Sequence, residues 1–331
     1  MLPPQFPMAE IDIVRPHGVF PHARRKGFLA FCAVLTALIA GLLTSPVGAA
    51  ADRGGAMADL QERRATAVAG TTAREHPRQP VDAPARSDQT ASADPAPSAA
   101  VPGNAVGIPS STFTRLLEVD GPIRCGAGTL PLVALTFDDG PGVLTRQTMR
   151  LLHEHGMTAT FFLVGKLLGE PRFEGLPELA ARIGALGDHT WDHVSMVGRT
   201  QTELDAQIAV TRRAITRASG ERVALFRPPL GQHDERVDAS VRSLGMLTVL
   251  WSLESGDSQG ASADRIFRTV RDSLSAGDII LLHENRGTTQ RALPRILDLI
   301  EARGFTTVTV PELLAQDPPT SQQLRAGTCP A

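Results

Sequence analysis

Residues 131–155, PLVALTFDDGPGVLTRQTMRLLHEH, contain the pattern that decides the fold. An apolar run, 131–137, ends at two adjacent aspartates and a Gly-Pro turn, and an amphipathic segment, 145–155, follows. The first segment predicts a strand and the second a helix, because buried strands are short apolar runs and surface helices repeat apolar residues every three to four positions. A strand followed directly by a helix indicates an α/β fold.

The same alternation of strand and helix continues towards the C-terminus. The further predicted strands are 159–164, 186–188, 224–226, 247–253, 278–282 and 306–310. The further predicted helices are 176–183, 201–218, 235–244, 263–275 and 290–303. Seven strands over about 200 residues predict a deformed (β/α) barrel of parallel strands with its site at their C-terminal ends. A doubly wound open sheet is the alternative that periodicity leaves open.

The N-terminal part of the chain has a different composition. An apolar run, 28–43, follows three basic residues and precedes Ala49 and Ala50, which predicts a signal peptide within residues 1–50, or a membrane anchor if it is not cleaved. Residues 51–115 are rich in Ala and Pro and poor in large apolar side chains, which predicts a disordered linker. The folded domain is then expected over residues 116–331.

Export and composition restrict the class of protein. We expect a secreted, cell-surface or cell-wall protein of a bacterium, which touches a membrane only through an uncleaved N-terminal segment. The net charge is −2 and no basic cluster stands out, which argues against nucleic acid as a partner. We expect a monomer.

The chain contains three cysteines, and Cys32 lies within the export segment. In an oxidising compartment the other two, Cys125 and Cys329, can form a disulfide that joins the two ends of the domain. Two separate free thiols are the alternative.

Polar side chains cluster where predicted strands end, which is where a barrel collects its catalytic groups. Asp138 and Asp139 follow the first strand, and His189 and His193 follow the third. The spacing of the histidines, i and i+4, places them on one side of a helical turn, a common arrangement for metal ligands. Each motif alone also fits a surface turn or a solvated histidine pair. Together they form a His-His-Asp set that leaves positions open for water and substrate.

Two more motifs follow in order, Arg227-Pro228-Pro229-Leu230-Gly231 after the fourth strand and Leu281-Leu282-His283 at the end of the sixth. The whole ordered set of motifs resembles the NodB-homology polysaccharide deacetylases, the fourth family of carbohydrate esterases. The resemblance covers about residues 130–314.

The resemblance implies a role for each residue at the strand ends. It implies that Asp139, His189 and His193 hold a divalent metal ion, with zinc expected. It implies that Asp138 is the general base and that Arg227 pairs with it and keeps it ionised.

The remaining roles concern the leaving group and the acetyl group. His283 is the implied general acid, held by Asp257, and the backbone N–H of Leu230 helps to stabilise the oxyanion. The expected substrate pocket is formed by Leu281, Trp191 and Pro229.

The expected reaction is metal-dependent hydrolysis of N-acetyl groups on an amino-sugar polymer, with release of acetate. Peptidoglycan is the favoured polymer, because export and a linker place the domain at a bacterial wall, and chitin-like chains come second. Hydrolysis of acetyl esters on xylan-type polysaccharide is an alternative, because attack on an acyl carbon does not depend on the leaving atom.

A catalytically weakened carbohydrate-binding domain is a further alternative. Leu230 stands where the family usually has Tyr. Glu254 and Ser258 stand around Asp257 where the family has Asp and Trp. Loss of these aromatic side chains affects the expected binding of sugar rings.

Overall fold

The structure is a computed structural model that describes residues 107–330. The predicted signal segment, 1–50, and most of the predicted linker lie outside the described residues. Within residues 107–330, no helix combines the length and the apolar character that crossing a membrane requires.

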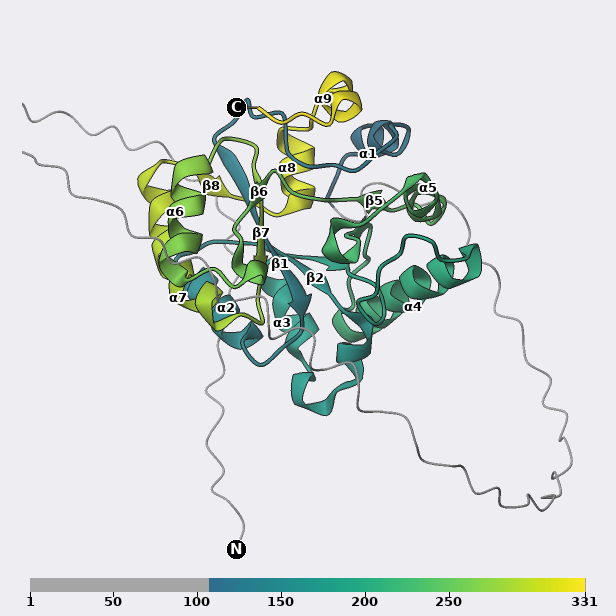
Figure 1. Cartoon of the computed structure of the whole chain (residues 1–331), viewed down its shortest axis with the longest axis horizontal. Coiled ribbons are helices and arrows are strands. Elements are labelled where there is room, and N and C mark those ends of the chain that lie inside the picture. The colour runs from purple at the N-terminus through teal and green to yellow at the C-terminus, as the bar shows by residue number, and fades with distance from the viewer. Residues whose placement is uncertain (1–106, 331) are drawn as a thin grey trace, which may run out of the picture. The chain divides into compact units, whose positions relative to one another are not determined.

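A parallel sheet lies at the centre of the domain (Figure 1). Its strands are β1 (Leu132–Gly140), β2 (Thr160–Leu163), β3 (Ala185–Asp188), β4 (Leu225–Phe226), β5 (Leu247–Thr248), β6 (Leu253–Glu254), β7 (Ile279–His283) and β8 (Thr306–Thr307). The strand order is β5-β4-β3-β2-β1-β7-β6, and β8 pairs with the beginning of β1. No pairing between β5 and β6 closes the sheet within residues 107–330, so it forms a curled half-barrel. The prediction of a deformed, parallel (β/α) barrel is confirmed.

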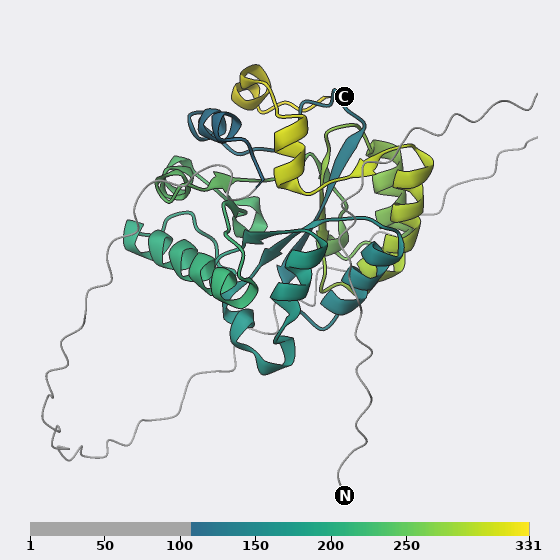
Figure 2. The same ribbon diagram turned by 180° about the vertical axis from the view of Figure 1, so that it is seen from behind.

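Helices follow most strands and cover the sheet, as the view from behind shows (Figure 2). Those of the repeating units are α2 (Thr145–Glu154), α3 (Leu176–Ile183), α4 (Gln201–Ser219), α5 (Glu235–Ser243), α6 (Ala263–Ser273) and α7 (Gly287–Ala302). Three others are α1 (Ser110–Leu117), α8 (Val310–Gln316) and α9 (Ser321–Ala326). Each of the six helices predicted from periodicity is present, with its ends within three residues of the prediction.

Strand β1 shows how the sequence positions the site. Successive side chains of a strand point to opposite faces of the sheet. Val133, Leu135 and Phe137 belong to one buried apolar cluster, which includes residues of α2 and α7, whereas Leu132 and Ala134 belong to a second cluster. Asp138 lies on the same face of β1 as Leu132 and Ala134. Its carboxylate is therefore on the concave side of the sheet, at the C-terminal end of the strand.

The opposite end of the half-barrel is filled by α1 and α8, which lie together with α9 at the top of Figure 1. Ile108, Phe113 and Leu116 are buried there against the second apolar cluster. The predicted linker, 51–115, overlaps α1, and the boundary predicted at residue 116 is too late. The prediction failed because α1 is short and its stability depends on burying these side chains in the domain.

The prediction of one strand over residues 247–253 is also wrong. This segment contributes to two short strands, β5 and β6, which lie at opposite edges of the sheet. β5 pairs with β4, and β6 pairs with β7. Between them the chain crosses from one edge to the other, and the carbonyls of Val249 and Leu250 accept hydrogen bonds from the Arg227 side chain. Arg227 therefore satisfies backbone groups that a continuous strand would place in a ladder.

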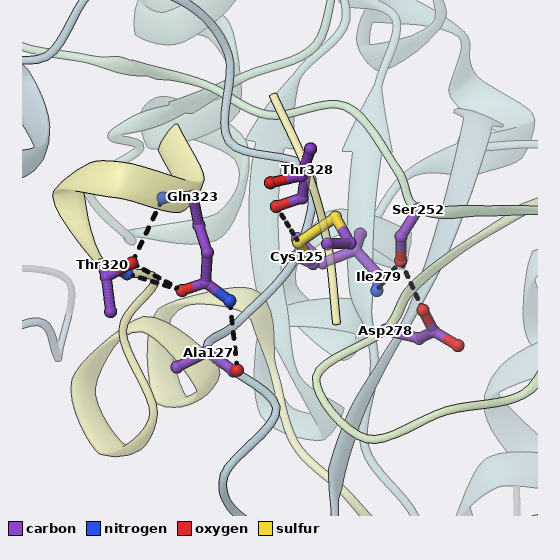
Figure 3. Close-up of a disulfide and its surroundings, with 9 residues drawn as sticks. Cys125, Ala127, Ser252, Asp278, Ile279, Thr320, Gln323 and Thr328 are labelled. Carbon is purple, nitrogen blue, oxygen red and sulfur yellow. Dashed lines mark hydrogen bonds between the residues drawn. A yellow bond between two sulfur atoms is a disulfide. The ribbon is translucent and has the colours of Figure 1, made fainter. Parts of the chain in front are cut away.

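A disulfide joins Cys125, just before β1, to Cys329, after α9, and closes a sequence separation of 204 residues (Figure 3). Gln323 of α9 donates a hydrogen bond to the carbonyl of Ala127 beside it. The bridge and this hydrogen bond fasten the C-terminal segment to the beginning of the domain.

Candidate active site

The carboxylate of Asp138 is the most enclosed acid at the end of β1, with 2% of the residue exposed. Arg227, fully buried, donates to it from Nη1 over 2.7 Å. The guanidinium also stacks on the ring of Phe162, 4.0 Å from its centroid. Because its other nitrogens are held by the backbone beyond β5, Arg227 fixes the position of the Asp138 carboxylate.

Asp139, His189 and His193 come together beside Asp138. One possible ligand atom from each lies within 4.8 Å of the others. Nε2 of His193 is 3.0 Å and Nε2 of His189 is 3.7 Å from Oδ1 of Asp139. These are the three residues that the resemblance assigned to a metal ion.

The environment of His189 sets its protonation. Burial lowers the pKa of His189, so the ring is neutral at pH 7. Its Nδ1 lies 2.7 Å from the carbonyl oxygen of Arg227. A carbonyl only accepts, so Nδ1 carries the hydrogen and Nε2 keeps a lone pair directed at the other two ligands. Such a second hydrogen bond is typical of a histidine that binds a metal.

Asp139 has the other property that a ligand needs. Its Oδ1 is buried and accepts no well-aligned hydrogen bond within the described residues. Burial alone would raise the pKa of Asp139, but the close imidazoles of His193 and His189 hold it well below its usual range. An ionised, unsatisfied oxygen next to two imidazoles fits a divalent cation that takes nitrogen and oxygen ligands, such as zinc.

The backbone of the site differs from the helical turn predicted for residues 189–193. This segment is irregular, and Thr190 and His193 have positive φ angles of 67° and 59°. Among residues 107–330, the only other non-glycine residues with positive φ are Asp139, at 71°, and Leu230, at 60°. Left-handed backbone costs free energy for such residues and concentrates at functional sites. The histidines thus converge through local backbone conformation and not through helical spacing.

His283, at the end of β7, pairs in register with Asp138 of β1. Its Nδ1 lies 2.7 Å from Oδ1 of Asp257, and Thr289 donates to the other oxygen of that carboxylate. Burial opposes the cationic form of His283, but the hydrogen bond and charge of Asp257 outweigh it and raise the pKa of His283. Since Asp257 occupies Nδ1, Nε2 remains for a ligand.

These groups surround a cavity of about 320 Å³. Its lining residues are Asp138, Asp139, His189, His193, Leu230, Trp251, Glu254, Ser258, Leu281, His283 and Arg286. Leu230 is 70% exposed at the rim, and Leu281 is buried in the wall.

Two residues predicted for the pocket do not line it. Trp191 packs on Gly165, where a Cβ would come within 2.4 Å of the indole, and the backbone N–H of Trp191 donates to Oε1 of Gln207. Pro229 is buried in a 3-10 turn, Pro229–Gly231. Trp251 lies in the cavity wall instead. It lies three residues after the end of β5, inside the segment that was wrongly predicted as one strand.

Sequence reasoning also missed polar residues that act through the predicted ones. Asn285 donates to Oδ2 of Asp139 over 3.2 Å, and Thr289 holds Asp257. Their position within six residues of His283 was the available signal, because loops after barrel strands carry the site.

Glu284 was missed as well. It is fully buried, and neither of its carboxyl oxygens has a hydrogen-bond partner in the described part of the chain. Burial raises the pKa of Glu284 from its usual 4.5 to about 8, and the neighbouring charges of Asp139 and Asp138 add to this. Glu284 is therefore a neutral acid at pH 7.

The sequence of this chain is similar to those of known proteins. The sequence profile described as polysaccharide deacetylase matches residues 127–249. A peptidoglycan-N-acetylglucosamine deacetylase of Bacillus cereus is 31% identical over 190 residues, 55% of this chain and 67% of that protein. A bifunctional xylanase/deacetylase of Pseudobutyrivibrio xylanivorans is 32% identical over 185 residues, 55% of this chain but only 30% of that protein.

A solved structure of similar fold is a peptidoglycan N-acetylglucosamine deacetylase in complex with an N-hydroxybenzamide compound. It superposes with a TM-score of 0.56 at 28% identity, covering 60% of this chain and 94% of that one.

Proposed function

This chain belongs to the polysaccharide deacetylase family, and from that premise we propose that it hydrolyses N-acetyl groups on an amino-sugar polymer with the help of a divalent metal ion. The observation that carries the proposal is the meeting of three groups in one cavity. These are the Asp139, His189 and His193 cluster, the Asp138 carboxylate and the His283 imidazole.

The residues divide the proton transfers of amide hydrolysis between them. The metal ion, when bound, supplies Lewis acidity that polarises the acetyl carbonyl. Asp138, held by Arg227, accepts a proton from the water that attacks the acetyl carbon. His283 gives the proton on Nε2 to the nitrogen as the carbon–nitrogen bond breaks, so that acetate and a free amine leave. Asp257 stabilises the cationic imidazole that this step needs.

Two further groups, one apolar side chain and one backbone N–H, complete the proposed active site. Leu281, in the buried wall, contacts the acetyl methyl group. Leu230 lines the cavity in a left-handed conformation, and its backbone N–H is the proposed donor to the developing oxyanion. Because this role uses the backbone, leucine replaces the family's usual tyrosine without losing the donor.

We propose peptidoglycan as the polymer and zinc as the metal. A relative that matches over two thirds of its own length is named for peptidoglycan N-acetylglucosamine, which supports the polymer. Two imidazoles and one carboxylate are ligands that zinc prefers in catalytic sites.

Hydrolysis of acetyl esters is a second candidate. It is favoured by the relative named as a xylanase/deacetylase. Retention of the three candidate ligands, the base and the acid argues against a weakened carbohydrate-binding domain.

We further propose that the chain is exported and acts as a monomer at a bacterial wall. The Cys125–Cys329 disulfide supports export, because such bridges persist in oxidising compartments. Fractionation of expressing bacteria, with blotting of the wall, membrane and cytoplasmic fractions, tests the location. A protein confined to the cytoplasm would contradict it.

Acetate release by the full chain tests the function. The substrates are re-N-acetylated peptidoglycan, chitin oligomers and acetylated xylan, each with added zinc and with a chelator. We expect zinc-dependent release from peptidoglycan and its loss in Asp138→Asn, which keeps the size of the side chain but removes the base. Asp298→Asn is the matched control, because it makes the same change at a side chain that is 71% exposed on α7 and does not line the cavity.

The outcomes separate the candidates. Release from xylan alone would establish the ester hydrolase, and the amide proposal would be wrong. No release from any substrate by protein that binds zinc would favour the binding domain.

A further inference from the structure

We propose that Arg286 is a specificity residue that makes the cavity favour polymers with a carboxylate on the sugar next to the one whose acetyl group is hydrolysed. This inference rests on the proposed function and names the chemistry of its substrate.

Arg286 occupies a defined place beside the reacting groups. It lies three residues after His283 and lines the same cavity as His283, Leu230 and Trp251. Its carbonyl accepts the N–H of Gln290 at the start of α7, so its backbone is held by a helix whose inner face is buried. The backbone of Arg286 is therefore fixed relative to the catalytic imidazole, while its side chain is exposed and lines the cavity.

The other charged groups at the centre of the cavity have partners within the protein. Asp138 pairs with Arg227, His283 pairs with Asp257, and Asp139 lies against two imidazoles. The Arg286 guanidinium forms no ion pair or hydrogen bond with any residue in 107–330. It is the permanent cation of the cavity lining whose charge remains available for a ligand.

Glu254 limits where an anionic group fits. Its carboxylate lines the same cavity and accepts a hydrogen bond of 2.7 Å from Gln259, but it forms no ion pair with Arg286. An anion is attracted at Arg286 and repelled at Glu254. An anionic ligand group is therefore expected closer to Arg286 than to Glu254.

The chemistry of the polymers then distinguishes them. Chitin and the xylan backbone are neutral. Peptidoglycan alternates acetylated glucosamine with a second acetylated sugar whose lactyl ether ends in a carboxyl group, free when the peptide has been removed. A guanidinium binds a carboxylate with two parallel hydrogen bonds, so the charge at Arg286 matches this neighbouring group.

The test compares one glycan in two charge states. The substrate is re-N-acetylated peptidoglycan chains stripped of peptide, used as they are and after conversion of the carboxyl groups to amides. For Arg286→Gln, we expect KM on the charged chains to rise about three- to tenfold, with kcat within about twofold of the unsubstituted protein, because a partly screened pair at a cavity edge contributes modest binding. On the amidated chains KM should not change.

Two further variants strengthen the test. Glu254→Gln should lower KM on the charged chains only, because it removes a repelling charge. Arg303→Gln, the same charge change at the other end of α7, is the matched control and should alter neither substrate. Chains that keep their peptides carry carboxylates further from the sugar. A KM increase in Arg286→Gln that is seen only on these peptide-bearing chains would place the recognised carboxylate on the peptide. This result would overturn the proposal that Arg286 binds a carboxylate on the sugar.

Equal effects of Arg286→Gln on charged and amidated chains, or no effect on either, would overturn the proposal. Failure of the unsubstituted protein to release acetate from any chain would instead overturn the proposed function, so the two failures are distinguishable.

Discussion

The buried carboxyl of Glu284 makes the free energy of unfolding depend on pH. Substitution of this one residue separates its contribution from those of other groups. Its carboxyl is fully buried, and burial raises the pKa of Glu284 from 4.5 to about 8. In the unfolded chain this acid loses its proton near pH 4.5, whereas in the folded chain it keeps the proton until about pH 8. Between these values the folded state binds one more proton, so the free energy of unfolding falls as pH rises.

The size of the effect follows from the shift. Each pKa unit corresponds to about 1.4 kcal/mol, so the contribution is fully present below pH 4.5, and about 4 kcal/mol of it is lost by pH 7.5. Glu284→Gln has the shape of the neutral acid and does not titrate. The difference in unfolding free energy between the two proteins should therefore change by about this amount, in favour of the variant, between pH 4.5 and pH 7.5.

Urea unfolding of chelated protein, followed by circular dichroism at intervals of half a pH unit, measures this difference. Chelation keeps metal binding out of the comparison. Glu301→Gln is the matched control, because Glu301 is exposed on α7 and should give a curve parallel to that of the unsubstituted protein. Parallel curves for Glu284→Gln as well would refute the buried, neutral state of Glu284.

Three other perturbations test the site and the frame around it. Asp257→Asn removes the charge that raises the pKa of His283, so activity should be lost at lower pH on the alkaline side of the pH–rate profile; an unmoved alkaline limb would contradict the acid role. Gly165→Ala places a methyl group against Trp191, and we expect a loss of about 1–3 kcal/mol in unfolding free energy together with weaker zinc binding by calorimetry; unchanged values would show that the loop holding the histidines is not supported by this contact. Cys329→Ser should lower the unfolding free energy by about 2–5 kcal/mol in non-reducing buffer, and reductant should have the same effect on the unsubstituted protein; an unchanged midpoint would mean that the bridge does not stabilise the domain.

Local patterns were sufficient for most of the fold. Helix α3 has the predicted bounds, 176–183, because its apolar face and the glycines on either side are both visible in the sequence. The capping boxes of α8 and α9, Thr309 with Glu312 and Thr320 with Gln323, were visible too. The box of α8 was missed because residues 306–310 were assigned to a strand, and the box of α9 lies beyond the last predicted element.

Other features depend on contacts between distant residues. The division of 247–253 into two strands follows from hydrogen bonds donated by Arg227, about 20 positions earlier in the chain. Trp251 and Arg286 could not be identified from the sequence, because the tertiary fold decides which side chains line the cavity. The motif residues themselves were predictable, because parallel strands bring their C-terminal ends to one edge, and the structure brings Asp138, Asp139, His189, His193, Arg227, Asp257 and His283 together there.

We propose that the Asp139, His189 and His193 cluster binds the metal ion on which acetate release depends. The most direct measurement is a zinc titration of chelated, full-length protein, with bound zinc and acetate release from re-N-acetylated peptidoglycan followed in the same samples. We predict that activity rises with bound zinc and saturates at one equivalent, and that His189→Ala abolishes both. Full activity in the metal-free protein, or in His189→Ala, would contradict it.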